Sequence, residues 1–304
     1  MQLSRVLPVN PLVPLLLSLL MVGCAGLPGF IQGSEEMTEE RCPAPGEWVV
    51  AGQHESITSA QLLAQINENS IVLLGERHKS REDHQWQLHL LAALNGRFDN
   101  MAVGYEMFVR DQQPQLDAWL AGELNDEELL EQSDWDRHWG MDFSLYAPLL
   151  RFNRLQRVPG EALNVPRELV RRIGQEGWQA VPREERYGLS QAAEPREEYR
   201  EFLATMASHH GHEAASEEEV TAFIRSQGVW DRAMAEGLYS LQQRGYGPVA
   251  GIIGRGHMEN RQGVPRQLAD LGAESVWVLL PWREGEACMG PDTTPADALY
   301  GLPL

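Results

Sequence analysis

The chain has few basic residues for its acidic content. Lys and Arg together number 25 against 44 Asp and Glu, which gives a formal net charge of -19. A surface of that sign repels the phosphates of nucleic acids. We therefore expect no DNA or RNA partner.

Several motifs that carry common enzyme chemistries are missing. The sequence contains no G-x-S-x-G, no G-x-x-x-x-G-K, no H-E-x-x-H and no C-x-x-C. Their absence argues against a nucleophile elbow, a phosphate-binding loop, a helical zinc site and a paired-cysteine site. The segment from Gly254 to Gly256 lacks the third glycine of a dinucleotide fingerprint, so we expect no Rossmann nucleotide site.

Long apolar runs are scarce, and the run near the N-terminus is too short to cross a bilayer as a mature helix. It extends from Leu12 to Val22 and follows a single positive charge at Arg5. A short apolar core behind a positive charge is typical of a secretory signal. We predict a signal peptide over residues 1–23.

The end of this signal indicates a lipid anchor. Met21 to Cys24 reads Met-Val-Gly-Cys, which resembles a bacterial lipobox with Met21 in place of the usual Leu. By that resemblance the chain is cleaved before Cys24 and the cysteine is diacylated, which anchors it stably. Ala25 rather than Asp in the next position resembles an outer-membrane sorting signal, so we expect an outer-membrane lipoprotein on the periplasmic face. Simple secretion with cleavage near Ala25 is the alternative.

Cysteine is also scarce, because lipidation of Cys24 leaves only Cys42 and Cys288. Each lies near one end of the mature chain, and the compartment beyond the inner membrane is oxidising. A bond between them would close a long loop and tie down both tails. Two interpretations stay open, because sequence does not give the distance between them: a disulfide or two separate thiols. A catalytic thiol is a further, weaker alternative.

The rest of the chain predicts one α/β domain behind a tether. Residues 24–46 are rich in Gly, Pro and Glu and lack periodicity, which indicates a tether between lipid and domain. Over 47–304, strand and helix patterns alternate, which predicts a mostly parallel sheet flanked by helices. The predicted strands are Trp48–Ala51, Ile71–Leu74, Met101–Tyr105, Ala162–Val165, Val249–Ile253 and Val276–Leu280. Residues of about 179–244 are polar and then helical, which predicts a helical insertion.

Two of the predicted strands end in the same way. The segment Leu73 to His78 (LLGERH) aligns with Ile252 to His257 (IIGRGH), so each apolar strand is followed by Gly-x-x-His. Ligands of open parallel sheets bind beyond the carboxyl ends of the strands. We therefore expect both histidines at one edge of the sheet, although two such short matches also arise by chance.

Acidic side chains accompany these histidines. Glu76 lies two residues before His78 on an extended segment, so the two side chains project to the same side. Glu106 follows the strand that ends at Tyr105. Together with His257, these residues form a candidate cluster suited to a divalent cation such as zinc or manganese, or to acid-base chemistry. The alternative is that Glu76 pairs with an arginine and the histidines are core groups.

His84 extends the same pattern. It lies six residues after His78, near the start of the next predicted helix. It either faces the same crevice or is a solvated first-turn residue. The sequence leaves both interpretations open.

Five blocks of the sequence carry a resemblance to a known family. In chain order they are LLGERHKSREDH, VGYEMF, LNVPREL, QGVWDRAMAEGL and IIGRGHMENRQGVPRQL. They resemble the ChaN family, haem-binding lipoproteins of iron uptake that are grouped with Tiki and TraB proteins and erythromycin esterases. The resemblance covers about residues 51–280. It implies an α/β sheet with a helical subdomain.

The resemblance implies two different ligands. ChaN-like proteins are thought to stack two haems at a dimer interface with tyrosine as the iron ligand, and Tyr146 is the best candidate here, although it also suits an ordinary helix core. A phenolate is a known ligand of haem iron. Arg167 and Arg255 could pair with haem propionates or a substrate carboxylate. Tiki-type relatives instead hold a catalytic divalent metal at positions that match Glu76 and its three partners.

Three functions follow, in this order. The first is a lipid-anchored, periplasm-facing protein that binds haem for iron uptake, with a homodimer on haem binding. The second is a metal-dependent hydrolase of the Tiki or erythromycin esterase type, with Glu76, His78, Glu106 and His257 as metal ligands and catalytic groups. The third is a lipid-anchored scaffold. Whether the chain is an enzyme stays open at this point.

Overall fold

The computed structural model describes residues 39–209, 215–291 and 293–303. The predicted signal peptide, the lipidation site Cys24 and most of the tether lie outside these ranges. The described residues belong to one unit, Glu36–Leu304. Within them, no helix is both long and apolar enough to cross a membrane.

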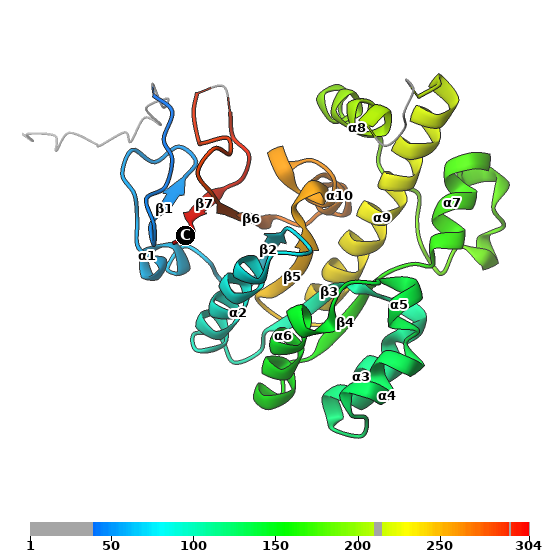
Figure 1. The fold of residues 1–304 in the computed structure, drawn as a ribbon, viewed down its shortest axis with the longest axis horizontal. Coiled ribbons are helices and arrows are strands. Elements are labelled where there is room, and N and C mark those ends of the chain that lie inside the picture. The colour runs from blue at the N-terminus through cyan, green and yellow to red at the C-terminus, as the bar shows by residue number, and fades with distance from the viewer. Residues whose placement is uncertain (1–38, 210–214, 292, 304) are drawn as a thin grey trace, which may run out of the picture. The chain divides into compact units, whose positions relative to one another are not determined.

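A seven-stranded sheet, in the order β1-β7-β6-β2-β5-β3-β4, organises the fold (Figure 1). The strands are β1 (Trp48–Val50), β2 (Ser70–Glu76), β3 (Ala102–Val109), β4 (Gly160–Asn164), β5 (Val249–Gly254), β6 (Ser275–Trp282) and β7 (Ala298–Gly301). Among these seven strands of the described residues, β1 pairs with β7 in antiparallel fashion and the other neighbouring pairs are parallel. The predicted α/β class with a mostly parallel sheet is confirmed.

The central strands are buried on both faces. All residues of β2, β3 and β5 are buried, which is typical of a sheet covered by helices on both sides. Alternate residues of β2 divide between two cores. Val72 and Leu74 pack on one face, while Ile71 and Leu73 pack on the other.

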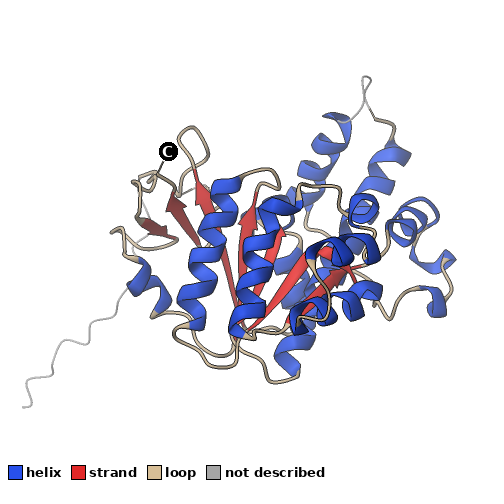
Figure 2. Cartoon of the chain, turned by 60° about the horizontal axis from the view of Figure 1, so that its bottom comes forward, coloured by secondary structure: helices blue, strands red, loops and turns tan. Residues whose placement is uncertain are grey.

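Helices cover both faces of this sheet (Figure 2). The α-helices of the described ranges are α1 (Ser59–Leu63), α2 (Arg81–Asn95), α3 (Gln113–Ala121), α4 (Asp126–Gln132), α5 (Trp135–His138), α6 (Phe143–Gln156), α7 (Arg167–Glu176), α8 (Glu197–His209), α9 (Glu217–Gln243) and α10 (Val264–Leu271). Side chains of α2, α3 and α6 join the core that contains Val72 and Leu74. Side chains of α9 and α10 join the opposite core.

The predicted helical insertion corresponds to α8 and α9 together with the connection before them. Helix α9 begins at a capping box formed by Ser216 and Glu219. Its N-terminal half packs on α8 through Ile224, which contacts Tyr199 and Leu203. Its C-terminal half packs on the sheet, so one long helix joins the two parts of the fold (Figure 1).

At the edge of the sheet that carries β1, the structure contains an additional strand and decides between the two interpretations of the cysteines. Strand β7 was not predicted, and it lies between β1 and β6. Cys42 and Cys288 form a disulfide, with their Cα atoms 4.7 Å apart. The disulfide interpretation of the two cysteines is therefore the one that the structure supports. The bond joins the segment before β1 to the loop between β6 and β7.

Candidate functional site

The two Gly-x-x-His segments lie side by side. Strands β2 and β5 are parallel neighbours, with Gly75 opposite Ile253 and Glu76 opposite Gly254. Both strands run in the same direction, so both histidines follow them at the same edge of the sheet. The Gly-x-x-His motif that occurs twice in the sequence therefore follows two adjacent strands, β2 and β5.

Glu76 is the buried centre of the first group. Its Oε1 lies 2.8 Å from Nδ1 of His78, and its Oε2 lies 2.8 Å from Nε2 of His84. Burial alone raises the pKa of Glu76, but the hydrogen bonds and charges of the two histidines outweigh it and lower the pKa to about 2. Glu76 is therefore ionised at neutral pH, and it raises the pKa of both histidines against the effect of their own burial.

His78 presents its second ring nitrogen away from Glu76. With Nδ1 hydrogen-bonded to the carboxylate, Nε2 is the nitrogen left to meet a ligand. The His78 side chain is 33% exposed, and its ring meets the edge of Trp139 at a centroid distance of 4.8 Å. It also lies over Gly254, where an added Cβ would be 2.6 Å from His78 Cε1. The glycine of the second motif therefore makes room for the histidine of the first.

His257 is held by a carboxylate at Nδ1, as His78 is. Its Nδ1 lies 2.7 Å from Oδ1 of Asp231, a buried residue of α9. The hydroxyl of Tyr199 donates to the second oxygen of Asp231 at 3.3 Å. Burial lowers the pKa of His257, but the Asp231 carboxylate outweighs this effect and raises it to about 9. A carboxylate at Nδ1 fixes the ring and directs Nε2 outward.

Glu106 lies between the two histidines. It belongs to β3 rather than following it, because the strand continues to Val109 past an irregularity in its pairing with β4. Irregular strand pairing commonly redirects a side chain near a functional site. Glu106 Oε2 accepts a hydrogen bond from the backbone N–H of Gly254 at 2.6 Å. Its Oε1 lies 3.6 Å from Nε2 of His257.

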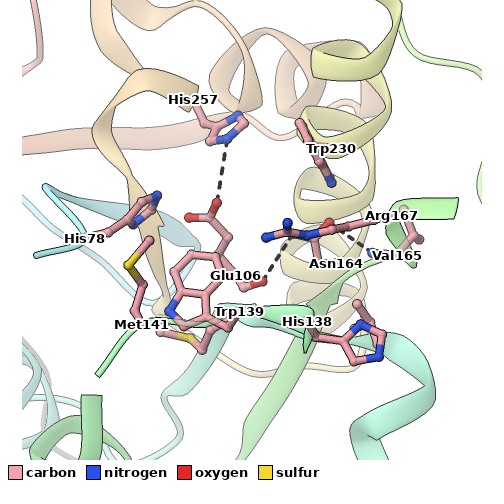
Figure 3. Close-up of a pocket in the computed structure, with 12 residues that line it drawn as sticks. His78, Glu106, His138, Trp139, Met141, Asn164, Val165, Arg167, Trp230 and His257 are labelled. Atoms are coloured by element: carbon pink, nitrogen blue, oxygen red, sulfur yellow. Dashed lines mark hydrogen bonds and ion pairs between the residues drawn. The ribbon is translucent and has the colours of Figure 1, made fainter. Parts of the chain in front are cut away.

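These side chains open onto one cavity of about 200 Å³ (Figure 3). Its wall combines imidazole, carboxylate, aromatic and thioether groups. The lining residues are His78, Glu106, Met107, Val109, His138, Trp139, Met141, Asn164, Val165, Arg167, Trp230 and His257. Arg167 extends toward the cavity from the start of α7 (Figure 3), and within the described ranges its guanidinium has no ion-pair or hydrogen-bond partner. Four of the predicted site residues therefore meet here: His78, Glu106, His257 and Arg167.

Three other predicted residues lie behind this cavity or away from it. Glu76 and His84 are buried next to each other and hold His78 from behind. His84 is therefore neither a solvated first-turn residue nor a cavity residue. Arg255 points elsewhere, because it pairs with Glu259 and Glu286. The predicted role of Arg255 in holding a propionate does not fit this position.

Tyr146 does not fit its predicted role as the ligand of haem iron. It is fully buried, and its single hydroxyl proton is shared between two acceptors, Glu76 Oε1 at 3.0 Å and the carbonyl oxygen of His78 at 3.2 Å. Burial and the charge of Glu76 raise the pKa of its phenol, which opposes a phenolate. Its contact with His84 is edge-on at 4.5 Å. Tyr146 is therefore a core residue of helix α6, which was the alternative to the ligand role, and its hydroxyl hydrogen-bonds to Glu76.

A divalent metal ion does not fit the observed positions. No group of three His, Cys, Asp or Glu side chains in the described ranges is placed to hold one. Glu76 in particular uses both oxygens on protein partners. Glu106, His78 and His257 share the cavity, but they do not form such a group.

Sequence analysis missed the residues that complete the site from α9 and from the connection between α5 and α6. Asp231 was not singled out, although it is three, four and seven residues before the buried Met234, Ala235 and Leu238. A charged residue at those spacings lies on the buried face of a helix, and that was the available signal. Trp139 gave no comparable signal, because its position depends on a turn between α5 and α6.

Comparisons with known proteins agree with this fold. The profile of the family described as "Haem-binding uptake, Tiki superfamily, ChaN" matches residues 62–268. The chain belongs to this ChaN family. A search of curated proteins gives no significant match.

Two solved structures align with this chain to different degrees. A structure described as cofacial haem binding to ChaN of Campylobacter jejuni aligns with a TM-score of 0.67 at 19% identity, over 83% of this chain and 95% of that one. An erythromycin esterase mutant, EreC, in its open conformation aligns with a TM-score of 0.46 at 13% identity, over 77% and 76%. The first likeness shows the α/β fold of the ChaN family in this chain.

Proposed function

We propose that this chain binds haem at the cavity between His78 and His257, as a lipid-anchored protein of haem or iron uptake. Family membership supports haem as the ligand. The observation that carries the proposal is the orientation of His78, whose Nδ1 is held by buried Glu76 while Nε2 is directed to the cavity. An imidazole nitrogen is a common axial ligand of haem iron.

The other cavity residues suit a porphyrin. Trp139, Met141 and Trp230 offer apolar surface for its faces. Arg167, unpaired among the described residues, is the arginine of the cavity wall available for a propionate. Bound haem would supply an iron centre, and the protein's part is to ligate it and to neutralise its carboxylates.

The size of the cavity supports a shared site. Sites that enclose a drug-sized ligand usually measure roughly 300–1,000 Å³, while this cavity measures about 200 Å³. A porphyrin would therefore project from it. We propose that a second copy of the chain covers the projecting part, so haem promotes a homodimer. Light scattering of the purified chain with and without haem tests this, and an unchanged mass contradicts it.

The lipid anchor is the second part of the proposal. The Met-Val-Gly-Cys sequence supports diacylation of Cys24 and attachment to the outer membrane, facing the periplasm. The disulfide is consistent with an oxidising compartment. Labelling of cells with a radioactive fatty acid tests the anchor: wild type should take up label, and Cys24→Ser should not.

Haem binding itself is tested by titrating haem into a soluble form that begins after Cys24. We expect a Soret band that shifts and saturates. Iron-free protoporphyrin is the control, and it should bind at least tenfold more weakly because it has no iron for His78. Absence of a Soret shift in wild type contradicts the proposal.

A second function, hydrolysis of an ester, lactone or peptide, is favoured by one observation. His78, His257 and Glu106 face the same cavity, and His257 has the buried Asp231 behind it, as acid-base groups often do. The metal-dependent form of this function requires the side chains to move together, since the described ranges hold no ready group of ligands. Elemental analysis tests it. An ion retained by wild type and lost from His257→Ala supports it, and no ion in either contradicts it.

A further inference from the structure

Glu286 joins the two histidine-bearing segments without touching either histidine. It lies in the loop between β6 and β7, and its carboxylate pairs with Arg77, the residue directly before His78. The same carboxylate accepts hydrogen bonds from Arg255, two residues before His257, at 3.0 and 3.1 Å. The three side chains are 19–28% exposed, so water screens these pairs only in part.

The part of the loop that carries Glu286, up to Met289, makes several contacts with the rest of the fold. Cys288, two residues further on, is bonded to Cys42. Met289 and Arg41 exchange backbone hydrogen bonds beside that disulfide. The backbone carbonyl of Glu286 accepts a hydrogen bond from the indole of Trp282 at 3.1 Å. The position of the carboxylate is thus set by a covalent bond and by backbone contacts.

The same set of ion pairs reaches the support behind His78. Arg77 also binds the fully buried Asp83, with its guanidinium nitrogens 2.7 and 2.8 Å from the two carboxylate oxygens. Asp83 directly precedes His84, which holds Glu76. Displacement of Arg77 would therefore disturb His78 along the chain and through α2.

We propose that Glu286 is a positioning residue that sets the relative position of His78 and His257 at the cavity, with the Cys42–Cys288 disulfide fixing Glu286 in turn. This inference rests on the proposed function, because the spacing of the histidines matters for a ligand that both of them face. Glu286 acts through Arg77 and Arg255, since those two residues are its contacts with the histidine segments.

The experiment compares Glu286→Gln with Glu161→Gln. Glu161 is the matched control, because it also pairs with an arginine, Arg244, at a similar exposure of 21%, yet it lies at the start of β4. We measure the ring NMR signals of His78 and His257 in the haem-free protein, amide hydrogen exchange of residues 75–78 and 254–257, and haem affinity. For Glu286→Gln we expect both ring signals to move, exchange to rise in both segments, and haem to bind about fivefold more weakly or worse, as for modest coupling between sites. Glu161→Gln should change none of these.

Unchanged ring signals and exchange in Glu286→Gln would overturn the proposal, whatever the haem affinity. Because these two readouts need no haem, they separate this inference from the proposed function. If wild type binds no haem but Glu286→Gln shifts both rings, the positioning role stands and the haem proposal fails.

A separate variant tests the part played by the disulfide. The variant Cys42→Ser/Cys288→Ser should move the same ring signals in the same direction as Glu286→Gln. When Glu286→Gln is added to the cysteine variant, we expect a combined shift smaller than the sum, because both changes act through one carboxylate. Fully additive shifts would overturn the link between the disulfide and Glu286.

Discussion

Glu76 Oε1 lies 2.8 Å from His78 Nδ1, and this pair defines which nitrogen of His78 meets the cavity. The carboxylate is buried and ionised, with a pKa lowered to about 2 by His78 and His84 against its own burial. The same geometry recurs at His257 and Asp231. The site is therefore built from two imidazoles, each oriented from behind by a carboxylate.

We expect Glu76→Gln to weaken haem binding by about 10–100-fold, which is typical when the partner of a ligating histidine is lost. The uncharged amide no longer favours a proton on Nδ1, so His78 loses its fixed orientation. Haem titration measures the effect. Glu82 is an exposed acidic residue at the start of α2, and Glu82→Gln should leave the affinity within about twofold. Equal affinity of Glu76→Gln and wild type would contradict the role of Glu76.

Gly254→Ala should displace His78 by direct contact. The added Cβ would lie 2.6 Å from His78 Cε1, which is closer than real Cβ atoms approach. We expect about tenfold weaker haem binding or more, in line with the cost of a small misplacement of a reacting group. Gly256→Ala is the control, because nothing lies within 4 Å of a Cβ there. If the two variants bind haem equally well, His78 is not the group that haem meets.

Asp231→Asn should change how stability depends on pH. Burial lowers the pKa of His257, but the Asp231 carboxylate outweighs burial and raises the pKa of His257 to about 9. A histidine whose pKa is higher in the folded than in the unfolded protein stabilises the fold. For His257 this contribution is complete below pH 6.5, the pKa of the unfolded histidine, and it is lost as the pH rises through about 9. Burial raises the pKa of Asp231 itself, which offsets part of this contribution. We therefore expect Asp231→Asn to lose on the order of 1 kcal/mol of unfolding free energy at pH 6 and to be at least as stable as wild type at pH 10. Urea unfolding at both pH values measures it, and a constant difference between the two proteins would contradict the pairing.

Loss of the disulfide should destabilise the fold. The bond closes a loop with a sequence separation of 246, and removal of a native disulfide typically costs about 2–5 kcal/mol. Urea unfolding of Cys42→Ser/Cys288→Ser against wild type measures the loss. A reductant should lower the stability of wild type and leave the double variant unchanged. If the reductant affects both proteins alike, the effect does not come from this bond.

The sequence predicted the central strands and the meeting of the histidines because both depend on local patterns. Continuous apolar runs such as Ile71–Leu74 indicate buried parallel strands, and strands of one direction bring their following residues to one edge. Strand β7 was missed because its four residues carry too short a pattern to distinguish it from a loop. It is held by its neighbours on both sides, which the local sequence does not reveal.

The direction of individual side chains was the less predictable part of the site. Tyr146 and Arg255 were both expected near the ligand, and tertiary partners decide otherwise. Tyr146 is turned toward Glu76 by a hydrogen bond across 70 residues of sequence, and Arg255 is drawn to Glu286. Asp231 and Tyr199 meet only because α8 packs on α9. Such contacts depend on the packed fold.

The most direct test of the account is spectroscopic identification of the iron ligand in the haem-loaded protein. Magnetic circular dichroism and resonance Raman spectra distinguish an imidazole ligand from a phenolate. We predict an imidazole signature that is lost in His78→Ala and kept in Tyr146→Phe and in His89→Ala, an exposed histidine of α2. A phenolate signature that disappears in Tyr146→Phe would contradict the account, because it would require Tyr146 to leave Glu76 and reach the iron.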